Sequence, residues 1–143
     1  MQLIESKPPI KVVVADETEL YLKSLVSLLS NDMITVIGSC SNVNDWEEIL
    51  IKEDNLPDVA LVSHKMAGKD SLHRAKLFKE RYPSVKIVIL TFSSDSSLIE
   101  KLVRPYLHSI LIKGKFEPRE IISLIKMVDI GYIFYPDIEL LRK

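Results

Sequence analysis

The sequence predicts an α/β protein: a doubly wound parallel sheet of five strands with helices on both faces. The first observation is a set of five short apolar runs, rich in Val and Ile, that mostly do not alternate with polar residues. Such runs are typical of strands buried on both faces, as in a parallel sheet. The second is that segments with helical spacing separate the runs, which gives the order βαβαβαβαβα with right-handed crossovers. The length of 143 residues suits one compact domain.

The predicted strands share a β-branched, apolar composition. In chain order they are IKVVVA (10–15), MITVIGS (33–39), DVALV (58–62), KIVILT (86–91) and SILIK (109–113). Hydrophobic residues make up 47% of the sequence, which is enough for a substantial core on both faces of such a sheet.

The first two predicted helices cover residues 18–30 and 44–53. The apolar face of the first consists of Tyr21, Leu22, Leu25, Val26, Leu28 and Leu29. The second begins with Asn44 and Glu47 at the spacing of a capping box. Its inward-pointing side chains are expected to be Trp46, Ile49 and Leu50.

The remaining helices are bounded by residues that favour helix ends. The segment 70–82 begins at Asp70, a good N-cap, and ends before Pro83, while a short helix over 95–103 ends before Pro105. The last helix begins at EPRE, with Pro118 in its first turn, and ends near Gly131. Its apolar residues are Ile121, Ile122, Leu124, Ile125 and Val128.

Composition limits the classes of function. Residues 10–130 are expected to form the domain, with 1–9 as an N-terminal extension and 131–143 as a tail or the start of a linker. The net charge of −1 argues against direct nucleic-acid binding by this domain. Cys40 is the only cysteine and is expected to be buried, which fits a reducing, cytoplasmic location. The first ten residues, MQLIESKPPI, lack the charged and apolar regions of a signal peptide, and no apolar run approaches the length needed to span a membrane.

Polar residues follow four of the predicted strands, at the edge where open parallel sheets form their sites. They are Asp16 and Glu17 after the first strand, Ser63 after the third, Thr91 after the fourth and Lys113 after the fifth. An adjacent pair of carboxylates favours a hard cation such as Mg²⁺. Each residue also has an ordinary explanation: acids suit a helix start, lysines extend over surfaces and threonine suits strands. Their joint occurrence at strand ends is what indicates a site.

These segments resemble the receiver domains of two-component response regulators, most closely the NarL/LuxR-type branch with a helix-turn-helix output. The resemblance covers about residues 10–136 and is carried by five segments in order: VVVADETEL, PDVALVSHKMAGKDSL, VKIVILT, ILIKG and GYIFYPDI. It implies the flavodoxin-like, CheY-like fold with strand order 2-1-3-4-5. It also implies a chemistry in which an aspartate ending the third strand takes a phosphoryl group from a histidine kinase with the help of Mg²⁺.

The sequence departs from this pattern at the position that accepts the phosphoryl group. That position is Ser63, and a serine hydroxyl is a poor nucleophile without a base and cannot form an acyl phosphate. The switch aromatic of the family is replaced by Ile110, and Ala67 stands where a proline is common. Asp16, Glu17, Thr91 and Lys113 match the family, but with one carboxylate missing we expect Mg²⁺ binding to be weak at most.

The interpretation is a degenerate receiver that acts in signal transduction, with transcription regulation as its output, by protein contacts and without aspartyl phosphorylation. It is not expected to be an enzyme or to require a cofactor. A homodimer is expected through the last helix, at Ile121, Ile122, Leu124 and Ile125, and a DNA-binding output domain is expected as a fused or separate partner.

Three alternatives stay open: a flavodoxin-like binder of a small ligand, a single-domain adaptor and a metal-dependent phosphotransfer enzyme with another acceptor. The first is disfavoured because carboxylates in the loop after the first strand would repel a phosphate. A Ser63–His64 hydrolase is disfavoured because neighbouring side chains on an extended chain point apart. His64, His73 and His108 lack the spacing of a metal site and are expected to be ordinary surface residues.

Overall fold

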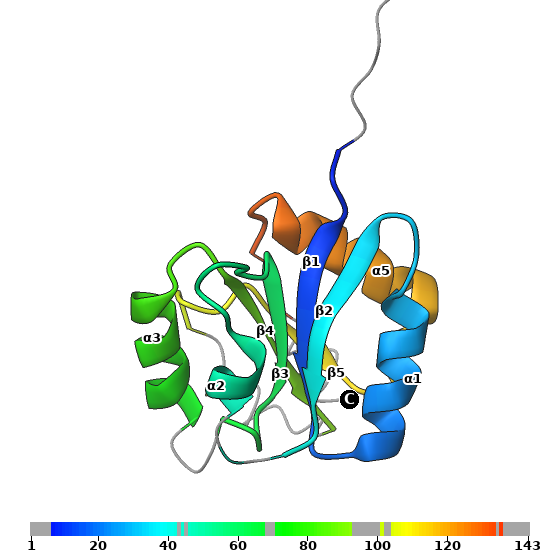
Figure 1. Cartoon of the computed structure of the whole chain (residues 1–143). Helices are drawn as coiled ribbons and strands as arrows, with labels where there is room; N and C mark the ends of the chain where they lie inside the picture. The colour runs from blue at the N-terminus through cyan, green and yellow to red at the C-terminus, as the bar shows by residue number, and fades with distance from the viewer. Residues whose placement is uncertain are drawn as a thin grey trace, which may run out of the picture.

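The predicted sheet is present in the protein. A computed structural model describes residues 7–42, 44, 46–67, 71–92, 101, 104–133 and 135. Its five parallel strands lie in the order β2-β1-β3-β4-β5 (Figure 1). They are β1 (Ile10–Ala15), β2 (Ile34–Cys40), β3 (Val59–Ser63), β4 (Lys86–Thr91) and β5 (Ser109–Ile112). Each strand begins and ends within one residue of its predicted bounds.

Four helices pack on this sheet in the part of the chain that is described. They are α1 (Glu19–Leu29), α2 (Trp46–Leu50), α3 (Ser71–Arg81) and α5 (Pro118–Asp129). The helix predicted over 95–103 lies outside the described residues apart from Lys101, as does the predicted N-cap Asp70.

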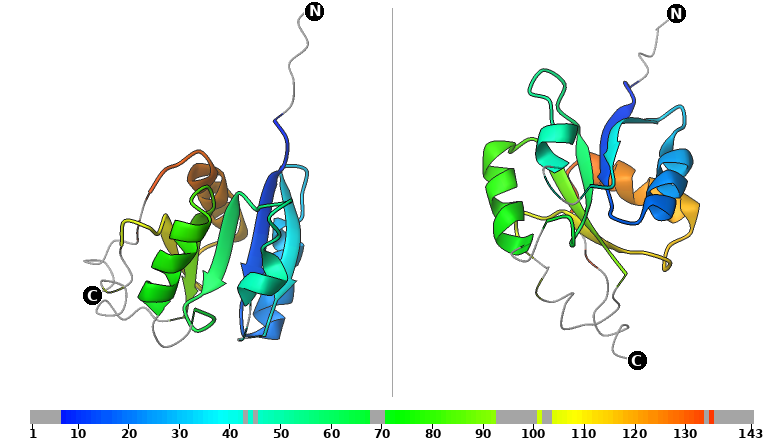
Figure 2. Two further views of the ribbon diagram at one scale, coloured as in Figure 1. Left: turned by 60° about the vertical axis from the view of Figure 1, so that its left-hand side comes forward. Right: turned by 60° about the horizontal axis from the view of Figure 1, so that its bottom comes forward.

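The helices form two layers, one on each face of the sheet (Figure 2). On one face, α2 and α3 cover side chains such as Ala60, Val62 and Ile89. On the other, α1 and α5 cover Val14 and Leu61. The alternation of neighbouring strand residues between the two clusters explains why the strands are apolar throughout, since a strand in the middle of this sheet has no face toward water.

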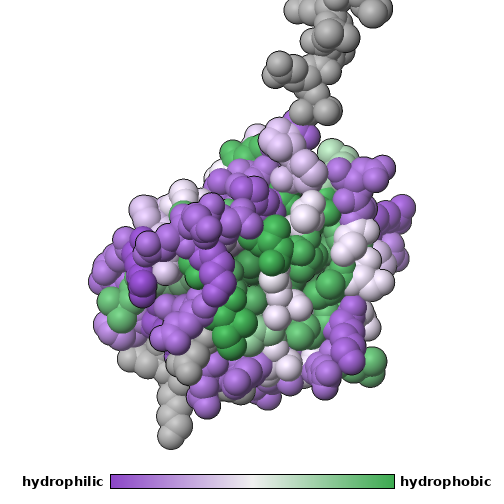
Figure 3. Space-filling view, in the orientation of Figure 1, coloured by the Kyte–Doolittle hydropathy of each residue, from purple (hydrophilic) through white to green (hydrophobic). Residues whose placement is uncertain are grey.

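The α2 helix is shorter than predicted. It has five residues instead of the ten expected over 44–53, because the chain after Ile51 forms a turn closed by a bridge between Lys52 and Asn55. Trp46 and Leu50 are buried as predicted, but Ile49 is 47% exposed, so its predicted inward position is wrong. A helix of little more than one turn can seat one i, i+4 pair on the sheet. Figure 3 shows hydrophobic residues in the middle of this face, where Figure 1 shows the strands.

The α5 helix begins and ends as the sequence predicts. The side chain of Glu117 accepts a hydrogen bond from the backbone N–H of Glu120, whose own side chain accepts one from the N–H of Glu117. Pro118 occupies the first turn, and Gly131, with φ of +100°, follows the helix in a left-handed conformation.

The inner side of α5 corrects the predicted dimer contact. Ile121, Leu124 and Ile125 are buried against the sheet, and Ile122 is half-buried. The prediction that these residues meet a second copy is wrong for the three buried ones, since the hydrophobic stripe of the helix is used inside the domain. The outer side of α5 instead presents residues such as Arg119, Ser123 and Met127.

Candidate functional site

The carboxyl edge of the sheet brings the predicted site residues together. Asp16 follows β1, Ser63 ends β3, Thr91 ends β4 and Lys113 follows β5, and these strands pair in register. All four residues are buried, and the neighbouring Glu17 is half-buried. Buried polar and charged side chains need partners, so the interactions among them decide what the site can do.

Lys113 and Asp16 form a buried ion pair between Nζ and Oδ2. The two side chains are 1% and 0% exposed. Lys113 Nζ also lies 3.8 Å from Oε1 of Glu17, and the other oxygen of Asp16, Oδ1, accepts a hydrogen bond of 2.8 Å from the N–H of Thr18. The ammonium therefore sits between the two carboxylates that were predicted as metal ligands.

Ser63 is engaged with the second carboxylate. Its hydroxyl is near enough to Glu17 to lower the pKa of that carboxyl, and its Oγ lies 3.4 Å from the backbone nitrogen of Lys65. Burial raises the pKa of the Glu17 carboxyl, but the hydrogen bond from Ser63 and the charges of Lys113 and Lys65 outweigh this and leave the pKa below its usual value. A carboxylate with a lowered pKa is a weak base, and Ser63 is 1% exposed. The pair is therefore poorly suited to nucleophilic catalysis.

Two aromatic rings cover the ammonium of Lys113. Its Nζ lies 4.8 Å from the ring centroid of Tyr21, on α1, and 4.3 Å from that of Phe92, which follows β4. The two rings meet edge to face, with centroids 6.2 Å apart. Burial and the charge of Asp16 raise the pKa of the Tyr21 hydroxyl to about 12, so its ring carries a neutral phenol at ordinary pH.

The roles of these rings were missed in the sequence. Tyr21 was predicted only as part of the apolar face of the first helix, and Phe92 was not singled out. A signal was present, because a large aromatic residue directly follows Thr91, the strand-end hydroxyl residue.

Three other residues that the sequence analysis singled out are buried in the protein interior. Ile110, at the switch position, is buried in the core beneath α2 and α3, and Ala67 is also buried. Cys40 is buried, as predicted.

The histidines are less uniform than predicted. His73 is exposed, but His64 and His108 are half-buried. Within the described ranges, no group of three His, Cys, Asp or Glu residues is placed to hold a metal ion.

The family model of the response regulator receiver domain matches residues 12–126. The chain belongs to this family. Receiver domains are the signalling domains of two-component systems, and the expected class of protein is therefore confirmed. None of the helices in the described segments has the length and apolar character needed to cross a membrane.

Similar proteins include a transcriptional regulator and several solved receiver domains. The transcriptional regulatory protein LnrK of Bacillus subtilis (strain 168) is 29% identical over 106 residues, which cover 73% of this chain and 47% of LnrK. The chain thus spans about half the length of this curated relative.

Two isolated receiver domains show the same fold. That of RcsB from Salmonella enterica serovar Typhimurium, in its apo form, has a TM-score of 0.77 at 20% identity and covers 94% of this chain and 99% of its own. That of the putative response regulator NarL from Mycobacterium tuberculosis has a TM-score of 0.75 at 21% identity, covering 87% and 99%.

The residues present do not fit the Mg²⁺ ion that the family implies. The acidic pair persists, but Asp16 is ion-paired with Lys113, whose Nζ also lies 3.8 Å from Glu17. Mg²⁺ requires anionic oxygen ligands in near-octahedral geometry, and the third position offers a hydroxyl instead of a carboxylate. We therefore derive no chemical step through a metal ion at this site.

Proposed function

We propose that this chain is an atypical receiver domain that acts through protein–protein contacts and without aspartyl phosphorylation. The observation that carries the proposal is Ser63 at the acceptor position, where its hydroxyl is buried at the end of β3. A hydroxyl in this state lacks the charge of an aspartate, and a serine phosphate would be a stable ester instead of a labile acyl phosphate. Lys113 would be free to assist a phosphoryl group only after leaving Asp16.

The proposed output is transcription regulation, in the NarL/LuxR-type branch. LnrK is named as a transcriptional regulatory protein, and solved structures of RcsB include a complex with DNA. We assign DNA binding to an output domain, fused or separate, because the net charge of this chain is −1.

Mass spectrometry tests the absence of aspartyl phosphorylation. The protein is incubated with acetyl phosphate and Mg²⁺, and beryllofluoride is added in a parallel sample while Trp46 fluorescence is recorded. We expect no mass increase and no spectral change in the wild type. Ser63→Asp is the matched variant, since it restores the acceptor carboxylate, and it is expected to gain a hydroxylamine-labile adduct. Such an adduct on the wild type would contradict the proposal, and a stable adduct would support the phosphotransfer alternative.

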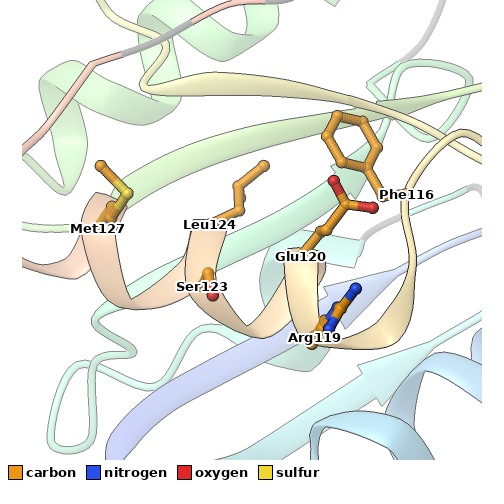
Figure 4. A pocket seen from close by; sticks show the side chains of 6 residues that line it. All are labelled: Phe116, Arg119, Glu120, Ser123, Leu124 and Met127. Atoms are coloured by element: carbon orange, nitrogen blue, oxygen red, sulfur yellow. The ribbon is translucent and has the colours of Figure 1, made fainter.

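A homodimer through the outer side of α5 is the second part of the proposal. A hollow of about 430 Å³ lies along this helix, lined by Phe116, Arg119, Glu120, Ser123, Leu124 and Met127 (Figure 4). The exposed apolar residues Met127, Ile130, Tyr132 and Ile133 continue from it toward the chain end. Neighbouring exposed apolar side chains are typical of an interface, and a two-fold dimer is the commonest assembly.

Light scattering at tens of micromolar tests this dimer. We expect the mass of a dimer without any phosphodonor, and a monomer for Ile130→Glu. Leu77→Glu on α3 is the control, because Leu77 is similarly exposed on another helix and its substitution should leave the dimer intact. A wild-type monomer, with or without phosphodonor, would rule out the homodimer and favour a different partner protein.

A further inference from the structure

We propose that the rings of Tyr21 and Phe92 form a lid that holds the ammonium of Lys113 on Asp16, so that this lysine is the resident cation of the pocket and divalent metal ions are excluded. The inference deepens the proposed function and rests on it in one respect. Because Ser63 stands at the acceptor position, Lys113 finds no carboxylate at the end of β3. It adds a defined occupant and names the two residues that keep it in place.

The contacts of the ammonium carry the proposal. Lys113 Nζ is ion-paired with Asp16, lies 3.8 Å from Glu17 and faces both ring centroids within 5 Å, at 4.8 Å for Tyr21 and 4.3 Å for Phe92. An ammonium over the face of an aromatic ring within about 6 Å is attracted by the ring quadrupole, most strongly when it is shielded from water. Here the lysine side chain is 1% exposed. Two carboxylates and two aromatic rings therefore surround the cation, and both kinds of group attract an ammonium.

The exposure of Phe92 is explained by this role. Its residue is 56% exposed although it is large and apolar, and it follows a strand that is almost wholly buried. A side chain in this position contributes little to the core. One side of its ring covers the ammonium, and much of the rest is open to water, as expected for a lid and not for a core residue.

The lid also joins three separate segments of the chain. Tyr21 belongs to α1, Phe92 follows β4 and Lys113 follows β5. The ammonium of Lys113 therefore connects these three elements at the carboxyl edge of the sheet. In a receiver that is phosphorylated, a bound metal ion or phosphoryl group would make this connection. The domain thereby gains a fixed arrangement at this edge without any added ligand. This is the property that a receiver without phosphorylation requires.

Proton NMR of the wild type tests the lid directly. Protons that lie over a ring face are shifted upfield by the ring current, so the ε-methylene protons of Lys113 are expected upfield of those of the other lysines. Phe92→Leu keeps an apolar side chain but removes the ring, and should move these signals toward ordinary values. Ordinary ε-methylene shifts for Lys113 in the wild type would overturn the proposal.

Titration with Mn²⁺ tests the exclusion of metal ions. The broadening of the amide signals of Asp16, Glu17 and Thr18 reports binding independently of any activity. We expect half-saturation of the wild type only at millimolar Mn²⁺ or above, and a gain in affinity of about tenfold for Phe92→Ala, the factor expected for losing one cation–π contact to a shielded ammonium. Tyr21→Leu should show a gain of similar size.

Tyr132→Ala is the matched control for Phe92→Ala, since Tyr132 is an aromatic residue of 57% exposure that lies after α5. It should bind Mn²⁺ no better than the wild type. A Phe92→Ala protein that is indistinguishable from this control would overturn the lid, and so would saturation of the wild type at micromolar Mn²⁺.

The lid and the absence of phosphorylation can fail separately. A hydroxylamine-labile adduct on a wild type whose Lys113 signals are upfield would contradict the proposed function and leave the lid in place before phosphorylation. Micromolar Mn²⁺ binding without any adduct would overturn the lid alone.

Discussion

The two edges of the sheet differ in the charges that they bring together. At the carboxyl edge, the ammonium of Lys113 lies against the carboxylate of Asp16, and both are buried. At the amino edge, Lys79, Lys86 and His108 lie close enough for their positive charges to act on one another. Burial lowers the pKa of Lys79 and of His108, and the charge of Lys86 lowers both further.

The difference shows where the fold depends on charge. A buried pair of opposite charges stabilises one arrangement because removing either partner leaves the other without compensation. Partly exposed like charges merely repel one another through solvent, and each can relax toward water. Substitutions at the carboxyl edge should therefore have large effects on stability and ligand binding, and substitutions at the amino edge should have small ones.

The largest expected effect is that of Lys113→Ala. This change leaves Asp16 as an unpaired buried carboxylate, and we expect the free energy of unfolding to fall by about 3–5 kcal/mol. Lys79→Ala at the amino edge removes a hydrogen bond of 2.8 Å to the carbonyl of Val85 but also relieves repulsion, so its cost should be at most about 1 kcal/mol. Urea unfolding followed by the fluorescence of Trp46, the only tryptophan, measures both. Equal losses of unfolding free energy in the two variants would contradict the proposed difference between the two edges.

The next effect is that of Ser63→Asp on Mg²⁺ binding. The wild type is expected to bind Mg²⁺ in the millimolar range or more weakly, at about −4 kcal/mol or less favourable. An aspartate at this position supplies a third carboxylate to the pocket and a further partner for Lys113, so the affinity should increase by about tenfold or more. Isothermal titration calorimetry measures it, with Ser63→Asn as the uncharged control. Micromolar binding by the unmodified protein would be incompatible with this prediction.

A smaller effect concerns Glu17 in acid. Its pKa is lowered in the folded state, so its carboxylate contributes stability above its unfolded value of 4.5, and this stability is lost as the pH falls through the lower folded pKa. Glu17→Gln should therefore be less stable than the wild type near neutral pH, and the two should converge in strong acid. Urea midpoints collected from neutral pH downward test this. A constant difference at every pH would argue against it.

The smallest effect is expected from His108, at the amino edge. Its pKa is lowered below 6.5, so the fold favours the neutral ring, and stability present above pH 6.5 should be lost as the pH falls through the folded pKa. His108→Asn should remove this dependence, while His73→Asn, on the exposed side of α3, should not. Thermal unfolding between neutral and mildly acidic pH provides the comparison, and identical pH profiles for all three proteins would disprove it.

The sequence predicted features that depend on local pattern. The strands followed from their apolar runs, and the convergence of Asp16, Ser63 and Lys113 followed from the rule that parallel strands end at one edge of the sheet. The start of α5 followed from Pro118 in the EPRE segment, although the reciprocal hydrogen bonds between Glu117 and Glu120 were not predicted.

What the sequence left undetermined depends on contacts between distant segments. The inner and outer sides of α5 both carry apolar residues, and only the position of the helix on the sheet shows that Ile121 faces the core and Met127 faces solvent. The exposure of Ile49 follows from where the turn after Ile51 begins. The lid requires Tyr21 and Phe92, 71 positions apart in the chain, to meet over one lysine, which no periodicity within a helix or strand predicts.

Tyr135 gives the domain a mechanical property. Its hydroxyl lies 2.6 Å from the carbonyl oxygen of Arg104 and 2.7 Å from that of Leu107, and its ring packs with the core beneath α2 and α3, although α5 lies on the other face. Tyr135 therefore fastens the chain that leaves α5 to the opposite layer, near the amino end of β5. Tension on any segment that follows residue 135 would be borne first by this tyrosine and the loop before β5, and would reach α5 only after the hydroxyl had released its carbonyl partners.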